Sequence, residues 1–343
     1  MSTTQPSPAL PTGASRAQVS PAPRSTRNVT EHSTARFGMM AETAPGRRPW
    51  ISIAVAWHLW SLDAPTVAIV WCWFLGAVFH VPYSRVTLPI LGLGTWVVYV
   101  ADRLLDGYSA TETASLRERH WFYFRHRRVF TIACLTVAAP LTWMILRLAQ
   151  PGVRLGDIAL CILGIAYFSL VHGHRSQSGA HRSRWFLIPK ELAVGFLFAV
   201  ACTMPTWLRA RHVPGLLLVD AIAFGALCSL NCVAIQTWED EEAAQEVMHS
   251  ILGASAGHPR IHPVTAFLWR HLKLWSAGLL VAGILGAWRA PGVPMALPWA
   301  AIAASAAIFL VLLHWRERLP AQALRIAADA ALLTPLLLWP LVR

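Results

Sequence analysis

Charged residues are scarce in this chain, and lysine is almost absent. Asp, Glu, Lys and Arg make up 13% of its 343 residues, whereas a soluble domain usually has about 25%. The basic residues include only two lysines, Lys190 and Lys273, and this preference for arginine is typical of a GC-rich bacterial genome. Although the formal net charge is +12, no basic block predicts a nucleic-acid surface. The composition therefore argues against a soluble nucleic-acid-binding protein.

Several motifs of common enzyme classes are also missing. The chain has no Walker A loop, no GxGxxG fingerprint and no HExxH zinc motif. Its six cysteines include no CxxC pair, and we predict no disulfide framework. The closely spaced histidines His172 and His174, and likewise His258 and His262, fall in expected loops. We therefore predict no histidine metal site.

Long apolar segments dominate the sequence instead. Hydrophobic residues make up 55% of the chain, and its 17 tryptophans suit membrane interfaces. Runs of about 20 apolar residues predict membrane-spanning helices. We predict an all-α, polytopic membrane domain at 48–343 with about nine transmembrane helices, the first of them broken near Asp63. The expected segments are 50–81, 87–107, 129–149, 155–171, 188–207, 216–237, 272–288, 297–315 and 321–341.

The first 47 residues differ from the rest. They are rich in Ser, Thr, Pro and Ala, with scattered arginines and few acids. Such a composition cannot bury a core, so we predict a disordered tail. The tail has no apolar region typical of a secretory signal. It loosely resembles an organellar transit peptide, but we favour the tail of a bacterial protein.

The basic residues predict how the helices are oriented. If the N-terminus is cytoplasmic, the tail and the loops after the even-numbered segments contain 22 of the 29 Lys and Arg residues. Loops rich in these residues stay on the cytoplasmic side. We therefore expect a protein of the bacterial inner (cytoplasmic) membrane with a cytoplasmic N-terminus.

Two carboxylates end the second apolar segment. Asp102 and Asp106 are four residues apart and share one helical face. Acidic side chains beside a bilayer are energetically costly unless they bind a cation or another partner. Mg²⁺ is usually bound by one or two carboxylates together with substrate phosphates. The pair therefore predicts a Mg²⁺ site. The alternative is an acid pair at a helix end that Arg103 neutralises.

A second acidic cluster follows the sixth segment, on the same expected side of the membrane. It contains Glu239, Asp240 and Glu242, and Asn231 precedes it within the apolar segment. Two acidic clusters on one face are typical of the two walls of a metal–phosphate site. The alternatives are a solvated loop for the acids and a helix–helix hydrogen bond for Asn231.

Basic residues near these acids are candidates for binding phosphate. Lys190 opens the fifth segment, where it either binds a phosphate oxygen or extends to the membrane interface. The aromatic, basic stretch at 117–128 includes Arg117 and Arg119. It either holds a diphosphate or contacts anionic headgroups. We expect headgroup contacts for most of it, with one or two arginines reaching the site.

These features together resemble the UbiA superfamily of intramembrane prenyltransferases. Residues 101–107 are similar to the end of its N-D-x-x-D-x-x-x-D motif, with Asp102 and Asp106 as the second and third aspartates. The acids at 239–242 occupy the place of its second Asp-rich region. Lys190 stands where family members often have a basic residue. The resemblance covers about residues 50–341 and implies a bundle of nine transmembrane helices.

The resemblance also implies a function and a set of site residues. Two Mg²⁺ ions would bind a prenyl diphosphate, one held by Asp102 and Asp106 and the other by Asp240 with Glu239 or Glu242. The prenyl group would then pass to an aromatic or other lipophilic acceptor. Lys190 would stabilise the leaving diphosphate. The substrate-binding residues would be Asn231, Arg103, Arg117 and Arg119.

Two other functions are alternatives to this one. Residues 106–110 match the D-G-x-x-A part of the CDP-alcohol phosphotransferase motif, but Thr111 replaces its arginine and the downstream G-x-x-x-D-x-x-x-D is missing. The stronger alternative is a catalytically degenerate UbiA-like protein that acts as a transporter or scaffold. Val98 and Tyr99 favour it, because they stand where the family has its Asn-Asp pair. Asp63 and Asp329, inside apolar segments, are the only residues that point toward a transporter.

Overall fold

The computed structural model describes residues 49–109, 122–123, 125–172, 189–210, 215–250 and 263–342. The predicted tail at 1–47 lies outside these residues. The chain divides into two units, Met1–Ile51 and Ser52–Arg343, and the contacts given below are within the second. All regular structure in the described residues is helical, which confirms the predicted all-α class.

Thirteen helical elements are described, twelve of them α-helices and the last a short 3-10 helix. They are α2 (Pro49–Leu59), α3 (Asp63–Val78), α4 (Thr87–Ser109), α6 (Arg127–Arg147), α7 (Pro151–His172), α8 (Lys190–Trp207), α9 (Gly215–Ser250), α10 (Pro263–Arg270), α11 (Leu272–Arg289), α12 (Val293–Trp315), α13 (Ala321–Ala331), α14 (Pro335–Leu338) and η3 (Trp339–Leu341).

The first predicted apolar segment is broken, as expected, into α2 and α3. The axes of the two helices differ by 90°. Ser61 lies between them with a φ of 56°, in the left-handed region that reverses the chain. Pro65 then fits in the first turn of α3, where the missing N–H leaves no helical bond unmade. At the break the side chains of His58, Ser61 and Asp63 are buried.

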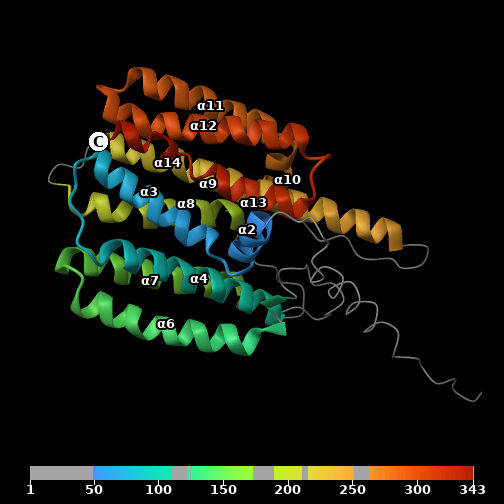
Figure 1. Ribbon diagram of the computed structural model, residues 1–343, viewed down its shortest axis with the longest axis horizontal. Helices are drawn as coiled ribbons and strands as arrows, with labels where there is room; N and C mark the ends of the chain where they lie inside the picture. Colours follow the sequence, from blue (N-terminus) through green and yellow to red (C-terminus); the bar gives the residue numbers. More distant parts are fainter. Residues whose placement is uncertain are drawn as a thin grey trace, which may run out of the picture. The chain divides into compact units, whose positions relative to one another are not determined.

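The long helices of the second unit lie side by side, with α11 and α12 at one edge and α6 at the other (Figure 1). Between them α8 packs on α9, and α3 contacts both α4 and α8. The helices alternate in direction, so the C-terminal ends of α4 and α9 and the N-terminal ends of α6 and α8 lie at the same end as α2 (Figure 1). These helix ends, which were expected on the cytoplasmic side, thus lie at one end of the second unit.

The number of helices suited to crossing a membrane is smaller than predicted. Within the described residues, five helical stretches are long and apolar enough, or up to seven if each of two bent pairs forms one span. The bent pairs are α2 with α3 and α10 with α11, the second bent by 76°. All nine predicted segments contain a helix, but α7 and α8 are not among the candidate spans. For α8, Lys190 and Glu191 in its first turn lower the mean hydropathy.

Apolar side chains both fill the interior and cover the outside of the helices. Inside, Trp71 stacks on Phe224 with ring centroids 4.0 Å apart, and its indole N–H donates to the Leu332 carbonyl at 2.8 Å. Outside, Leu155 and Trp288 are 71% and 78% exposed. Exposed large apolar side chains recur along α6, α7 and α11, and extended apolar surface is unusual in water-soluble monomers. The helices are therefore compatible with an integral membrane protein.

Candidate functional site: a polar cluster at one end of the helices

Two of the predicted site residues meet where α4 and α8 approach each other. Lys190, the first residue of α8, places Nζ 3.6 Å from Oδ1 of Asp102 on α4. Both side chains are about one-third exposed, so the pair lies at the edge of the helices rather than in the core. Asp106 lies one turn further along α4, but its side chain is outside the described residues, as are Arg117 and Arg119. Their roles stay predictions.

The second acidic cluster lies within a helix and not in a loop. Helix α9 continues through the acids to Ser250, so the solvated-loop alternative for this cluster is wrong. Glu239 is buried, with Oε1 3.3 Å from Nε of Arg325. The same guanidinium donates to Glu242 Oε2 at 2.7 Å. Asp240 accepts both of its described hydrogen bonds from Gln236, at 3.1 Å. Arg325 is thus the partner of two predicted metal ligands.

Asn231 makes the helix–helix hydrogen bond that was its alternative role. Its Nδ2 donates to Oδ1 of Asp329 at 3.0 Å and so joins α9 to α13. Its amide oxygen is buried and has no hydrogen-bond partner in the described part of the chain. The polar residue predicted to bind substrate therefore lies beside a buried acid.

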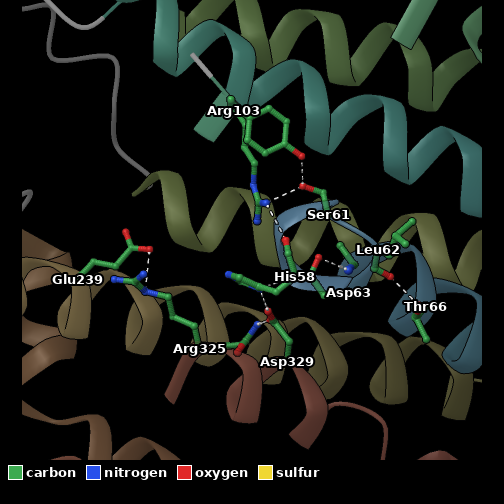
Figure 2. Close-up of polar contacts among 12 residues, drawn as sticks. His58, Ser61, Leu62, Asp63, Thr66, Arg103, Glu239, Arg325 and Asp329 are labelled. Atoms are coloured by element: carbon green, nitrogen blue, oxygen red, sulfur yellow. Dashed lines mark hydrogen bonds and ion pairs between the residues drawn. The ribbon is translucent and has the colours of Figure 1, made fainter. Parts of the chain in front are cut away.

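Arg103 points into the interior at the break between α2 and α3, although the family resemblance predicted that it binds substrate. Its guanidinium donates to Ser61 Oγ at 2.6 Å and to the His58 carbonyl at 3.3 Å (Figure 2). It lies over the rings of Tyr99 and Tyr123, 5.2 and 5.6 Å from their centroids. Hydrogen bonds and two aromatic faces together stabilise this buried cation.

A cluster that the sequence patterns did not predict lies next to Arg103. His58 Nδ1 is 2.8 Å from Asp63 Oδ2 and 3.6 Å from Asp329 Oδ2 (Figure 2). The three residues come from α2, from the first residue of α3 and from α13. Asp63 and Asp329 were noted as acids within apolar segments. His58 carried no such signal, because its position is set by the 90° break.

The described residues contain one group of three His, Cys, Asp or Glu side chains close enough to share a metal ion. It consists of His58, Asp63 and Asp329, whose donor atoms all lie within 4.8 Å of one another. The predicted ligands with described side chains, Asp102 and Asp240 among them, do not form such a group. Chemically, this end of the helices offers buried carboxylates, an imidazole and cations in contact with an apolar interior.

Comparison of the chain with family models, with curated proteins and with solved structures finds no match. The resemblance to the UbiA superfamily therefore rests on the residues at 101–107, 190 and 231–242 alone.

Proposed function

We propose that this protein is an integral membrane transferase that moves a prenyl group from a prenyl diphosphate to an aromatic or other lipophilic acceptor. The diphosphate binds at the end of the helices that carries Asp102 and Lys190. The prenyl chain lies among the apolar helices beneath it. We further infer that nine helical segments cross a bacterial inner membrane and that the N-terminus is cytoplasmic.

The contact between Asp102 and Lys190 is the observation that carries this proposal. The two residues were predicted separately from the sequence, one as a metal ligand and the other as a phosphate-binding cation. Their charged atoms are 3.6 Å apart, and both side chains are partly exposed. A diphosphate bound through Mg²⁺ needs such a pairing, since carboxylates hold the ion and an ammonium group contacts a phosphate oxygen.

The carboxylates at this end differ in how well they suit Mg²⁺. Asp102 and Asp240 offer the hard oxygen ligands that Mg²⁺ prefers, and Asp102 is partly exposed. Glu239 and Glu242 contact Arg325 instead, and their role as ligands stays a prediction. Bound Mg²⁺ would supply Lewis-acid neutralisation of the diphosphate charge, with Asp102 and Asp106 holding one ion and Asp240 contributing to a second.

The protein's own groups then perform three tasks in the transfer. The Lys190 ammonium stabilises negative charge that develops on the departing diphosphate. The apolar faces of the helices exclude water from the electron-deficient prenyl carbon. Aromatic side chains near the site stabilise the same carbon by cation–π contact. As the C–O bond to the diphosphate breaks, the acceptor forms the new bond to that carbon and loses a proton to the departing diphosphate or to solvent.

Ligand binding to the purified full chain in detergent tests the proposal. Geranyl, farnesyl and geranylgeranyl diphosphates are added with and without Mg²⁺, and the shift in the thermal unfolding midpoint is measured. We expect stabilisation that requires both the diphosphate and Mg²⁺, with no shift from the matching prenyl alcohols. Lys190→Gln removes a charged contact, so it should weaken binding about 10- to 100-fold. No Mg²⁺-dependent shift with any of the three donors would overturn the proposal.

One observation favours a second function, a transporter or scaffold of the same architecture. Arg325 neutralises Glu239 and Glu242, which a two-metal transferase would need as ligands. A catalytically degenerate protein would keep this end folded through ion pairs without binding a diphosphate. Stabilisation by Mg²⁺ and a prenyl diphosphate distinguishes the two functions, because only the transferase requires it.

A further inference from the structure

The cluster of His58, Asp63 and Asp329 is distinct from the Asp102–Lys190 pair, and the transferase proposal does not use it. All three side chains lie in the interior between packed helices, and the His58 and Asp63 side chains are only 6% and 8% exposed. Ionisable groups at such depth in a membrane protein are costly and usually serve a function. Their arrangement is therefore informative about chemistry that the acidic motifs do not reveal.

We propose that His58, Asp63 and Asp329 bind one divalent transition-metal ion. The amide oxygen of Asn231 is its fourth protein donor. This inference goes beyond the proposed function, because it concerns a different ion held by different residues.

The distances within the cluster match those around a small metal ion. Ligand bonds of about 2.0–2.2 Å place neighbouring donor atoms about 3–3.5 Å apart. In the cluster His58 Nδ1 lies 2.8 Å from Asp63 Oδ2 and 3.6 Å from Asp329 Oδ2. The ring nitrogen thus faces both carboxylates at once (Figure 2), so an ion can bind between them after small shifts of the side chains.

An oxygen without a partner on the same cluster is an independent sign of a missing ligand. The amide of Asn231 is attached to the cluster, because Nδ2 donates to Asp329. Its Oδ1 is fully enclosed but has no hydrogen-bond partner among the described residues. A buried carbonyl oxygen without a partner is destabilising. Coordination of a cation would satisfy it.

The charges of the cluster leave room for a cation. Among the described residues, Arg103 is the permanent cation beside the two carboxylates, and its described hydrogen bonds go to Ser61 Oγ and the His58 carbonyl rather than to either acid. With a neutral imidazole, one negative charge remains uncompensated in the interior. Either a proton within the cluster, on His58 or on a carboxylate, or a metal ion can compensate it, and metal titration separates the two.

The donor set indicates which metals fit. One imidazole nitrogen with two carboxylates suits Zn²⁺, Mn²⁺, Fe²⁺ or Co²⁺, whereas Mg²⁺ prefers oxygen ligands alone. The site is therefore expected to prefer Zn²⁺ and Co²⁺ over Mg²⁺, which is the opposite of the preference expected at Asp102.

Metal titration of the tag-free full chain in detergent tests this inference. The chelator-treated protein is titrated with Co²⁺, followed by visible absorption, and then with Zn²⁺ against a chromophoric chelator. We expect one ion per chain and no competition from millimolar Mg²⁺. Substitutions outside the ligand shell typically weaken metal affinity roughly 10- to 100-fold. Loss of a ligand should weaken it more. We therefore expect His58→Gln and Asp329→Asn each to weaken Zn²⁺ binding by at least about 100-fold.

Matched variants identify where the ion binds. His172→Gln with His174→Gln, and His258→Gln with His262→Gln, remove the other closely spaced histidines and should leave Zn²⁺ affinity unchanged. Asp102→Asn should also retain the Zn²⁺ site while losing Mg²⁺-dependent prenyl diphosphate binding, so the two proposals fail separately.

A measurement on the wild-type chain covers the case in which a cluster variant does not fold. X-ray absorption of the Zn²⁺-loaded protein should show one imidazole nitrogen among oxygen ligands. Absence of stoichiometric binding, or a spectrum with two or more imidazoles, would overturn the inference and leave a proton within the cluster as the compensating charge.

Discussion

The guanidinium of Arg325 on α13 lies against the carboxylate of Glu239 on α9, with Nε 3.3 Å from Oε1 and both side chains almost completely buried. The same guanidinium also binds the more exposed Glu242, one turn along α9. An arginine from the last long segment thus fixes the acidic part of α9. The buried Glu239 carboxylate thus has an equally enclosed cation as its partner, which offsets the cost of burying its charge.

Removal of Arg325 should therefore destabilise the protein strongly. Arg325→Met leaves the buried Glu239 carboxylate without its partner, a change that costs about 3–5 kcal/mol. Arg316→Met is the matched control, because Arg316 pairs with Glu241 on the surface, where an ion pair contributes about 0–1 kcal/mol. Thermal unfolding in detergent should show a much larger fall in the midpoint for Arg325→Met. Similar midpoints for both variants would contradict burial of the Arg325 pair.

The double variant Glu239→Gln with Arg325→Met separates charge from packing. It removes the uncompensated carboxylate, so it should be more stable than Arg325→Met alone. If the double variant is the less stable of the two, the lost packing of the arginine stem outweighs the buried charge.

The transferase proposal makes a direct prediction for the first acidic motif. Asp102→Asn and Asp106→Asn each remove a carboxylate that would hold Mg²⁺, so each should abolish Mg²⁺-dependent prenyl transfer while membrane expression stays normal. Consumption of radiolabelled prenyl diphosphate by purified protein measures the transfer. Glu241→Gln is the control, since Glu241 pairs with Arg316 on the surface, and it should retain transfer. Full activity in both aspartate variants would remove these residues from the site.

The helical segments could be predicted from hydropathy because each signal is local. All nine predicted ranges contain a helix, and the break before Asp63 followed from a polar residue and a proline in an apolar run. The number of spans was predicted less well, since five to seven described stretches qualify. Helix α8 shows why, because a charged first turn shortens the apolar part of an 18-residue helix.

The partners of the polar residues could not be predicted from local sequence. Arg325 was counted only among the basic residues of the expected cytoplasmic side, yet it contacts acids more than 80 positions earlier. His58 likewise acquires its neighbours from a bend and from a helix late in the chain. Charge and hydropathy predict which end of the helices a residue occupies, whereas its contacts depend on how distant helices pack.

The close packing of α8 on α9 depends on Gly195. A Cβ atom at this position would meet the backbone and side chain of Ser229. Small residues allow such close approach between helices in membranes. Gly195→Ala should therefore cost about 1–3 kcal/mol by overpacking and lower the thermal unfolding midpoint. Gly278→Ala on α11 is the matched control, because no described atom beyond its own helical turn lies within 4 Å of where its methyl group would stand. A helical Gly→Ala change is then neutral or stabilising by up to about 1 kcal/mol.

A buried tyrosine at the opposite end of the helices should make the stability of the protein depend on pH. Tyr83, in the link between α3 and α4, donates its hydroxyl hydrogen to the Cys72 carbonyl at 2.8 Å, and Arg209 lies 5.6 Å from the centre of its ring. Burial raises the pKa of the Tyr83 phenol well above its ordinary value of about 10. The folded protein thus keeps this proton at a pH at which the unfolded chain loses it.

The free energy of unfolding should therefore fall as the pH rises above about 10, because the unfolded state then binds fewer protons than the folded state. Tyr83→Phe removes this contribution. The Tyr83 hydroxyl also hydrogen-bonds Thr206 Oγ1, so at neutral pH the variant should be less stable by about 1–3 kcal/mol. The difference from the wild type should shrink as the pH passes through about 10. Chemical unfolding of both proteins across that range measures the difference. A constant difference would mean that Tyr83 ionises equally well in the folded protein, and the link between α3 and α4 would then be open to water.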